Sequence, residues 1–335
     1  MERRRLRTVF FGTAEFAVPS LEALVAAGHE VAAVVTQPDK PQGRGQRLTA
    51  SPVKKAAERL GLSVLQPRRV RADSFLQQMI ALTPDVLTLA AFGQIIPQAL
   101  LDLPPLGPIN VHGSLLPKYR GAAPIQRALM EGERETGVTT MWMEATLDTG
   151  DILLAESLPI APDDTTGTLT PKMAELGARL LLATLDGLAN GTITRRPQDD
   201  SQATYAPAIR PEDGFIRWEE PAPLIRDRIR GVTPKPGAFA AIKGRRVKIW
   251  KALADVGDVE LPITQPPGTI LKISKSPPGV LVADGAGTAV LLVEAQPENG
   301  RRMPAADWAR GLRLVPGDVF TPVEHGQAES TDEHR

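Results

Sequence analysis

Residues 86–91 read Val-Leu-Thr-Leu-Ala-Ala, a segment with one hydroxyl group among apolar side chains. A strand without polar alternation is buried on both faces, as are the strands of a parallel sheet that is covered by helices. Short runs of this kind alternate with amphipathic, helix-like stretches through residues 8–189. The pattern predicts an α/β fold with a Rossmann-like, mostly parallel sheet and helices on both of its faces.

This alternation predicts the individual elements of the first part of the chain. A helix is expected from Ser51, which can cap it, with Pro52 at its first position. Gly12 stands alone and does not complete a Gly-x-Gly-x-x-Gly fingerprint, so a dinucleotide site is not supported. Strands are expected at 8–11, 31–36, 63–65, 86–91, 138–143 and 152–157, and helices at 51–61, 74–82, 124–131 and 168–189.

Beyond residue 208 the pattern changes to short strands separated by turns. Strands are expected at 237–242, 245–252, 268–273, 279–283 and 288–295, with helices at 222–231 and 303–311. This arrangement is typical of a small antiparallel barrel of the OB type, which often binds nucleic acid. We expect a first domain at 1–194, a linker at 195–208, a C-terminal OB-like domain at 209–320 and a disordered tail at 321–335.

The composition excludes several classes of protein. A chain of 335 residues with 42% hydrophobic residues can form two globular cores. No apolar run approaches the roughly 18 to 20 residues that cross a bilayer, and no signal-peptide pattern is present. We therefore expect a cytoplasmic protein without membrane association. With no cysteine and four scattered histidines, the chain has no thiolate nucleophile and no metal-ligand spacing, so no metal is expected.

The formal charge is zero, but the charges are unevenly placed. Nine Lys or Arg residues and one acid, Asp227, occur between Ile225 and Lys251. A solvated helix face with exposed strand edges is one interpretation. A polyanion surface is the other, because Lys and Arg contacts to phosphates supply most non-specific nucleic-acid affinity. The charge distribution alone leaves both interpretations open.

Residues 110–121 carry the clearest chemical signal and read Asn-Val-His-Gly-Ser-Leu-Leu-Pro-Lys-Tyr-Arg-Gly. The segment begins as a short strand, so Asn110 and His112 point to the same face. Pro117 lacks an N–H group and indicates a sharp turn after the strand. A later turn supplies the carboxylate of Asp148. A carboxamide, an imidazole and a carboxylate near strand ends can polarise a carbonyl group and move one proton.

With these residues and further ordered matches, the chain resembles the methionyl-tRNA formyltransferase family of formyltetrahydrofolate-dependent enzymes over nearly its whole length. The set of Asn110, His112 and Asp148 is shared by enzymes that formylate glycinamide ribonucleotide or an amino sugar, whereas residues 37–45 favour tRNA as the acceptor. The matching segments besides 110–121 are 12–16, 36–45, 51–54, 91–97, 121–127, 135–139 and 147–151.

The resemblance implies formyl transfer from 10-formyltetrahydrofolate to the α-amine of methionine carried by initiator tRNA. Asn110 and His112 would donate hydrogen bonds to the developing oxyanion, and Asp148 would orient His112 and carry the proton. The implied partners are the folate co-substrate and the charged tRNA, and we expect a monomer. The residues expected at the folate site are Ser114, Leu115, Leu116, Pro117, Ala91 and Phe92.

The tRNA contacts are expected from two basic segments. The loop at 39–48 carries Lys40, Arg44 and Arg47, and its family counterpart enters the acceptor end of tRNA. Arg44 matches the position that senses the unpaired end of the initiator. Taken without the resemblance, the same residues also suit a generic surface loop. In the second domain the expected contacts are Arg245, Arg246 and Lys248, and Lys235 stands where relatives commonly carry the tryptophan of Pro-Trp-Pro.

The sequence leaves three other functions to compare with this one. A Ser-His-Asp hydrolase built on Ser114 is disfavoured, because the chain lacks the Gly-x-Ser-x-Gly elbow and a serine two residues from its base presents its hydroxyl poorly. An amino-sugar-nucleotide formyltransferase is the main alternative. A non-catalytic RNA-binding protein would not be expected to keep Asn110, His112 and Asp148 together.

Overall fold

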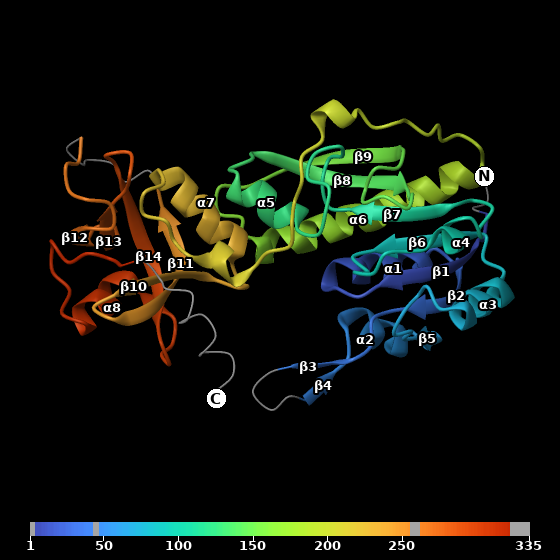
Figure 1. Ribbon diagram of the computed structural model, residues 1–335, viewed down its shortest axis with the longest axis horizontal. Helices are drawn as coiled ribbons and strands as arrows, with labels where there is room; N and C mark the ends of the chain where they lie inside the picture. The colour runs from blue at the N-terminus through green and yellow to red at the C-terminus, as the bar shows by residue number, and fades with distance from the viewer. Residues whose placement is uncertain (1–3, 43–46, 255–261, 322–335) are drawn as a thin grey trace. The chain divides into compact units, whose positions relative to one another are not determined.

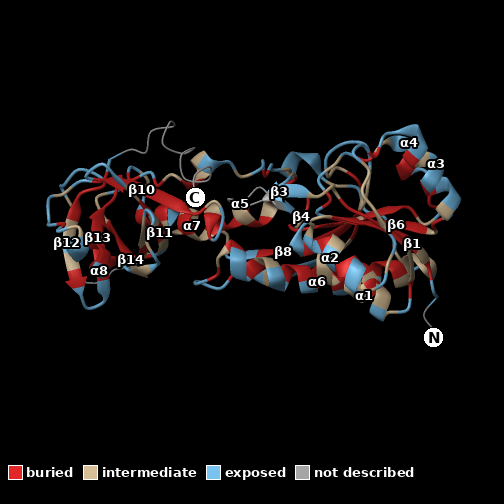
Figure 2. Cartoon of the chain, turned by 90° about the horizontal axis from the view of Figure 1, so that it is seen from below, coloured by how far each residue is buried: buried red, intermediate tan, exposed pale blue. Residues whose placement is uncertain are grey.

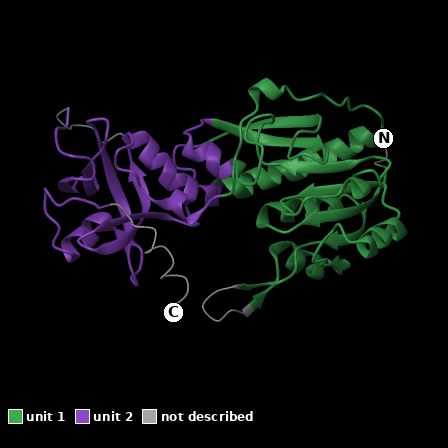
Figure 3. Ribbon diagram, viewed as in Figure 1, with its two compact units in different colours: residues 1–124, 135–160, 169–208 green, residues 125–134, 161–168, 209–335 purple. Residues whose placement is uncertain are grey.

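A computed structural model describes residues 4–42, 47–254 and 262–321 (Figure 1). The chain folds as two compact units (Figure 3). Unit 1 contains residues 1–124, 135–160 and 169–208, and unit 2 contains residues 125–134, 161–168 and 209–335. The segment 195–208, which we expected to be a linker, is part of unit 1. The expected tail beyond residue 321 lies outside the described residues.

Unit 1 is built around a seven-stranded sheet with the strand order β5-β2-β1-β6-β7-β8-β9. The strands from β5 to β7 are parallel, which confirms the mostly parallel sheet. β8 pairs antiparallel with β7, and β9 pairs antiparallel with β8, an edge that the sequence did not predict. The strands are β1 Arg7–Gly12, β2 Glu30–Val35, β5 Val64–Leu65, β6 Val86–Ala90, β7 Pro108–His112, β8 Glu135–Trp142 and β9 Ile152–Pro159.

Helices cover both faces of this sheet, and Figure 2 shows its central strands β1 and β6 as buried. On one face, α3 and α4 pack against strand residues such as Phe11 and Leu89. On the other face α6 lies so close that a Cβ atom on Gly177 would be 2.8 Å from Cγ1 of Val111. The helices are η1 Glu15–Ala17, α1 Val18–Ala26, α2 Pro52–Arg59, α3 Asp73–Leu82, α4 Gln98–Leu101, α6 Thr166–Ala189 and η2 Asp200–Gln202.

The start of α2 confirms the predicted cap. The Ser51 hydroxyl accepts a hydrogen bond of 3.0 Å from the backbone N–H of Lys54, and Pro52 is the first helical residue. Proline is favoured there because the first N–H of a helix has no partner within the helix. Capping and proline together therefore define where this helix begins.

The register of β7 decides which face its polar side chains reach. Asn110 lies beside Leu89 of β6, and Leu89 packs toward α3 and α4. Val111 points to the opposite face, toward α6. Because side chains alternate along a strand, Asn110 and His112 share the face of α3 and α4, near the carboxyl end of β7.

The antiparallel direction of β8 determines how the turn at 143–151 approaches β7. Trp142, the last residue of β8, is paired with Ile109 near the start of β7. The turn therefore leaves the sheet at the edge where β7 begins. To bring Asp148 within 3.6 Å of His112, it must run back along β7, whose residues advance about 3.3 Å each.

The loop expected at 39–48 has a paired base. Strands β3 Lys40–Gln42 and β4 Arg47–Thr49 form a hairpin with Lys40 opposite Thr49. Asp39 anchors its base, since it accepts hydrogen bonds of 2.7 Å from both Lys54 Nζ and Gln66 Nε2. These two donors hold the pKa of Asp39 below its ordinary value.

Unit 2 contains an antiparallel sheet with the order β10-β11-β14-β13-β12, to which β15 is added beside β14. The strands are β10 Ala238–Ile242, β11 Arg245–Leu253, β12 Ile270–Lys275, β13 Pro278–Ala283, β14 Ala289–Pro297 and β15 Met303–Pro304. The helices are α5 Pro124–Met130, η3 Pro211–Gly214, α7 Ala222–Val232 and α8 Ala305–Gly311. The helix expected at 303–311 thus begins two residues later, because Met303 and Pro304 pair with β14.

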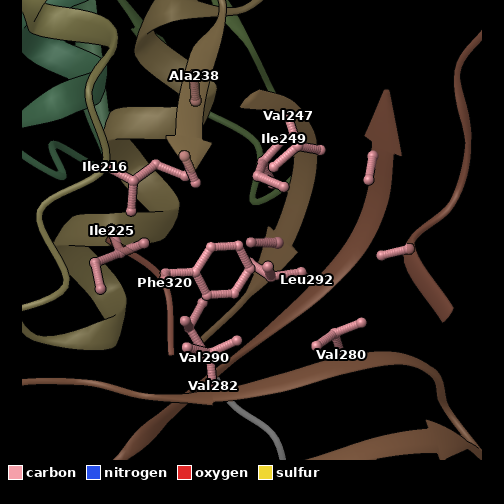
Figure 4. Packing of buried hydrophobic residues seen from close by; sticks show 14 of the residues in the cluster. Ile216, Ile225, Ala238, Val247, Ile249, Val280, Val282, Val290, Leu292 and Phe320 are labelled. Carbon is pink, nitrogen blue, oxygen red and sulfur yellow. The ribbon is translucent and has the colours of Figure 1, made fainter. Parts of the chain in front are cut away.

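The ends of this sheet are joined by the segment 318–321. The N–H of Ile270 donates to the carbonyl of Asp318, and the N–H of Thr321 donates to the carbonyl of Ala241, both at 2.8 Å. These bonds connect the first and last strands of the order, so the sheet is the small barrel that we expected. Inside it, Phe320 packs among the buried strand side chains (Figure 4) and stacks on Trp218 with ring centroids 4.6 Å apart.

Asp284, on the turn between β13 and β14, stabilises unit 2 from a buried position. Its carboxylate accepts hydrogen bonds from the N–H groups of Ala222, Ala286 and Thr288 and from the Thr288 hydroxyl. Ala222 is the first residue of α7, so this carboxylate also satisfies a free helix N-terminus. Asp284→Ala should lower the free energy of unfolding by about 2–4 kcal/mol, because these buried donors lose their acceptor.

The same carboxylate gives this stability a pH dependence. Burial alone would raise the pKa of Asp284, but the Thr288 hydroxyl and the backbone donors outweigh it and hold the pKa below its ordinary value of 3.8. The contribution is therefore present above 3.8 and is lost as the pH falls toward the folded pKa. The melting temperatures of wild type and Asp284→Asn should therefore converge as the pH falls from 3.8 toward the folded pKa. The control is Asp307→Asn, at a residue that is 53% exposed. If wild type and Asp284→Asn were equally stable at pH 7, this role of Asp284 would be contradicted.

Candidate active site

His112 is held through one ring nitrogen and faces a carboxylate with the other. Its Nε2 lies 3.0 Å from the carbonyl oxygen of Tyr119, and Nε2 carries the proton of this bond because a carbonyl only accepts. Its Nδ1 lies 3.6 Å from Oδ2 of Asp148, which is longer than a hydrogen bond. The side chains of His112 and Asp148 are only 6% and 12% exposed. Nδ1 is therefore the nitrogen that can exchange a proton inside the site.

Asp148 is fixed at both its side chain and its backbone. Its Oδ2 accepts a hydrogen bond of 2.8 Å from the N–H of Gly121, and its carbonyl accepts one of 2.8 Å from Nε2 of Gln198. Its φ of 53° lies in the left-handed region, which few residues other than glycine adopt.

Such backbone conformations gather at this site. Among the described residues, seven other than glycine have a positive φ, and Ala91, Tyr119 and Asp148 are three of them. Unfavourable backbone conformations persist where the surrounding structure holds them, and they are frequent at functional sites. Tyr119 has a positive φ, and its carbonyl oxygen is the atom that contacts His112.

Asn110 lies half-buried on the same face as His112, between Leu89 of β6 and Met141 of β8. Within the described ranges its carboxamide makes no hydrogen bond to another residue. Both of its N–H donors are therefore available to a ligand. The Asn110 carboxamide thus lies on the strand face that also carries His112, which faces Asp148. Such a set can stabilise negative charge on an oxygen and accept a proton.

Ser114 has a structural place in the turn after β7. Its hydroxyl donates to the carbonyl of Lys118 at 2.6 Å, and its own carbonyl accepts from the Thr139 hydroxyl at 2.7 Å. The ring nitrogens of His112 are directed at Tyr119 and Asp148. The geometry therefore rules out the Ser-His-Asp hydrolase.

The other residues expected at the folate site lie on two loops at the carboxyl edge of the sheet. Ala91 is exposed, whereas Phe92 is buried with its ring edge-on to Phe11 at a centroid distance of 5.3 Å. The Phe92 ring thus belongs to the core of unit 1. In the second loop Leu116 is buried, and Leu115 and Pro117 are half-buried.

Sequence reasoning missed the residues that orient this set. Tyr119 holds His112, Gly121 holds the Asp148 carboxylate, and Gln198 holds the Asp148 backbone. The first two stood within the segment 110–121, whose order was a usable signal. Gln198 gave no signal, because it lies in a polar stretch that we expected to be a linker.

The basic residues of β11 lie around one aromatic ring. Arg246 and Lys248 alternate with the buried Val247 and Ile249, so they share the outer face of the strand. The Arg246 guanidinium lies 4.0 Å and Lys248 Nζ 4.9 Å from the ring centroid of Phe239. Arg245 precedes them and is exposed, as is Lys235 on the turn before β10.

The arginines of α7 are engaged within unit 2. Arg226 and Arg230 pair with the buried Asp227 at 2.8 and 2.7 Å, and Arg228 pairs with Glu220 at 2.7 Å. The hydrogen bonds with Asp227 raise the pKa of Arg226. The basic stretch therefore divides into paired cations on α7 and a group on β11.

The hairpin residues are described only in part. Lys40 is exposed on β3, and Arg47 belongs to β4. Arg44, for which we expected contact with the end of tRNA, lies outside the described residues.

Two kinds of feature are absent from the described part of the chain. No group of three or more His, Asp or Glu side chains in these ranges is placed to hold a metal ion. Nor does any helix in them have the length and apolar character needed to cross a membrane.

Solved structures share this fold. HypX from Aquifex aeolicus in complex with tetrahydrofolic acid matches with a TM-score of 0.61 at 17% identity, covering 96% of this chain and 50% of that chain. An N-formyltransferase from Helicobacter canadensis, in complex with folinic acid and dTDP-3-aminofucose, matches with a TM-score of 0.63 at 19% identity, covering 86% and 99%. At such identities these structures show the fold alone.

The sequence defines the class more closely. Residues 6–185 match the family described as Formyl transferase, and residues 208–313 match Formyl transferase, C-terminal domain. The two family matches thus define a formyltransferase. The chain is 47% identical over 316 residues to the methionyl-tRNA formyltransferase of Moorella thermoacetica, covering 94% of this chain and 99% of the relative. It is 50% identical over 322 residues to that of Heliobacterium modesticaldum, covering 94% and 100%. The chain belongs to the methionyl-tRNA formyltransferase family.

Proposed function

We propose that unit 1 transfers a formyl group from 10-formyltetrahydrofolate to the α-amine of methionine esterified to initiator tRNA. The observation that carries this proposal is the pairing of His112 with Asp148 beside the free carboxamide of Asn110. It occurs in a chain that is 47–50% identical to methionyl-tRNA formyltransferases over nearly its full length. The enzyme would act as a monomer in the cytoplasm, where translation is initiated.

The folate co-substrate supplies the formyl carbon and a nitrogen leaving group. As the amine attacks, the formyl oxygen gains negative charge and needs hydrogen-bond donors. Asn110 offers its carboxamide N–H groups. His112 offers Nδ1, which donates only from the imidazolium form because Nε2 keeps its own proton in the bond to the Tyr119 carbonyl. One such donor typically contributes about 3 to 4 kcal/mol to stabilisation of the transition state.

The attacking amine must also lose a proton. Asp148 Oδ2 is the acceptor that the geometry offers, because Gly121 holds it in place and His112 Nδ1 lies beside it. From this position the proton can pass to the leaving nitrogen directly or through one water molecule. The Tyr119 carbonyl keeps the imidazole oriented during this transfer. A covalent enzyme intermediate is not required.

The proposed folate site combines the turn at 114–117 with Ala91. Both segments follow carboxyl ends of parallel strands, where open α/β sheets bind ligands. Two large apolar side chains on the neighbouring loops are exposed, Ile95 at 82% and Leu147 at 64%. Covering them with a flat ring system would remove apolar surface from water, which favours binding.

The proposed tRNA contacts divide between specificity and charge. Arg44, together with Lys40 of β3 and Arg47 of β4, would meet the acceptor end. The group on β11 would contact phosphates without reading sequence, since phosphate contacts position a nucleic acid and base contacts specify it. Arg246 and Lys248 lie near the Phe239 ring on one outer face of β11.

An amino-sugar nucleotide is the alternative acceptor. The fold shared with the Helicobacter canadensis enzyme, at 19% identity, supports this alternative. The relatives at 47% and 50% identity favour tRNA.

A comparison of three acceptors tests the proposal. The purified chain would be incubated with radiolabelled 10-formyltetrahydrofolate and, in separate reactions, charged initiator tRNA, dTDP-3-aminofucose or glycinamide ribonucleotide. We expect label in the methionyl-tRNA and background counts in the two small acceptors. Label in the sugar nucleotide alone would refute tRNA as the acceptor.

Removal of charge from β11 should flatten the salt dependence of tRNA binding. We expect the combined change Arg245→Ala, Arg246→Ala and Lys248→Ala to weaken initiator and elongator tRNA about equally, and to reduce the slope of log affinity against log salt by roughly one unit per lost phosphate contact. Filter binding over a salt series measures this. The charge-preserving set Arg245→Lys, Arg246→Lys and Lys248→Arg is the control. An unchanged slope in the alanine set would show that these residues form a solvated surface without phosphate contacts.

A further inference from the structure

We propose that Gln198, anchored by Arg120, is a positioning residue that holds the Asp148 turn in its catalytic conformation. The proposal rests on the role of Asp148 proposed above. Nε2 of Gln198 donates to the carbonyl of Asp148 at 2.8 Å and to the carbonyl of Gly150 at 2.7 Å. One carboxamide thus bridges two carbonyls on either side of Thr149.

The orientation of this carboxamide follows from its partners. Oε1 of Gln198 accepts hydrogen bonds from Nε and Nη2 of Arg120, at 3.1 and 2.8 Å. A guanidinium only donates and a carbonyl only accepts, so the oxygen must face Arg120 and the nitrogen must face the turn. Both amide hydrogens and the amide oxygen are used, which leaves the side chain one arrangement.

Arg120 is itself fixed from several directions. Its side chain is 3% exposed and also donates to Asp200 at 2.6 Å. Its backbone N–H donates to the carbonyl of Thr204 at 2.8 Å, and its carbonyl accepts from the N–H of Ala206 at 2.7 Å. A buried guanidinium with carboxamide and carboxylate acceptors is a rigid anchor.

Three consecutive residues therefore orient the whole reacting pair. Tyr119 holds His112 Nε2, the Arg120 side chain holds Gln198, and the Gly121 N–H holds the Asp148 carboxylate. Asp148 is fixed from two sides, through its Oδ2 and through its carbonyl. Fixing the carbonyl matters because the left-handed φ of 53° at Asp148 is unfavourable without outside support.

Loss of the Gln198 donors should let the turn relax and move Oδ2 away from His112 Nδ1. A misplacement of about 1 Å in a reacting group can reduce the rate a hundredfold. We expect Gln198→Glu to lower kcat about 10- to 100-fold, with KM for tRNA and for folate within about threefold of wild type. Glutamate keeps the contact with Arg120 but presents oxygen to two carbonyls. Gln198→Met loses the contacts with Arg120 and with the turn, so its kcat should fall at least as far. It serves as the second variant if the glutamate protein is unstable.

A double mutant separates positioning from a general effect on the fold. Because Gln198 acts through Asp148, adding Gln198→Glu to Asp148→Asn should change kcat less than about twofold. If Gln198→Glu instead acted through a structural defect elsewhere, the loss of kcat in the double mutant would be the product of the two single losses. Gln202→Glu, the same change at an exposed glutamine of the same segment, is the matched control and should keep wild-type kcat.

The outcomes are distinguishable. Wild-type kcat in folded Gln198→Glu or Gln198→Met, or multiplied losses in the double mutant, would overturn the positioning role while leaving the proposed function intact. Near-normal turnover in Asp148→Asn would instead overturn the proposed role of Asp148, on which this inference rests.

Discussion

Asp148→Asn should reduce the turnover of formyl transfer by about two orders of magnitude or more, while the affinity for charged tRNA changes little. Asparagine has nearly the size of aspartate, and its carbonyl oxygen can still accept the Gly121 N–H. It carries no negative charge beside His112 Nδ1, 3.6 Å away, and it cannot accept the proton of the amine. The substitution therefore removes the negative charge and the proton acceptor but keeps the size of the side chain. Single-turnover rates at saturating folate measure it.

The same assay compares the other two residues of the set. Asn110→Ala and His112→Ala should each lower turnover by a similar order, because each removes a donor to the oxygen that gains charge. Asp102→Asn, the same substitution at an exposed residue of unit 1, should keep the wild-type rate. A folded Asp148→Asn protein with near-normal turnover would show that the carboxylate carries no proton.

Arg44→Ala should reduce formylation of initiator tRNA far more than that of elongator tRNA, and so reduce the ratio between them. Gly43 and Gly45 flank this arginine and let a backbone approach nucleic acid closely. A guanidinium offers bidentate contact to a base or a phosphate. A tRNA with a closed terminal pair must first be opened, at about 1 to 2 kcal/mol for one stacked pair. Values of kcat/KM on the two charged tRNAs measure the effect.

A second variant, Arg44→Lys, separates charge from geometry, because lysine keeps the positive charge and loses the planar fork of the guanidinium. If recognition requires the fork, lysine should lose most of the discrimination while keeping non-specific binding. Lys40→Ala on the same hairpin should weaken both tRNAs alike. Equal losses on both tRNAs for Arg44→Ala would show that this residue adds charge alone, and discrimination would have to come from another part of the chain.

Local patterns in the sequence were sufficient for most of the fold. The apolar residues of β6 predicted a strand buried on both faces, and all five of its residues are buried. The cap at Ser51 predicted the start of α2. The alternation along β7 placed Asn110 and His112 together on one face. Each of these predictions depends on neighbours within a few residues, where periodicity and backbone chemistry are decisive.

Pairings between distant residues could not be predicted in this way. The hairpin of β3 and β4 reads as a glycine-rich loop, because its short strands contain little apolar alternation. The antiparallel edge formed by β8 and β9 depends on the direction in which strands meet. Nothing in the local pattern of residues 143–151 indicates that this turn runs back toward His112.

Polar networks were the least predictable part of the site. Gln198 lies 50 residues from Asp148 in a stretch without periodicity, yet its amide holds the turn. The ion pairs of α7 could not be predicted for a related reason. Arg226 and Arg230 both pair with Asp227, which the sequence shows only as one acid among many cations. Hydrogen-bond and ion-pair partners are set by tertiary folding, and a sequence pattern does not report them.

The central claim is that this chain formylates methionine on initiator tRNA, with Asn110, His112 and Asp148 performing the transfer. The most direct test is the initial rate of formyl transfer from 10-formyltetrahydrofolate to charged initiator and charged elongator methionine tRNA, measured side by side for wild type and Asp148→Asn. We predict rapid transfer by wild type to the initiator, much slower transfer to the elongator, and almost none by the variant to either. Absence of transfer to methionyl-tRNA by the wild-type protein would contradict the claim.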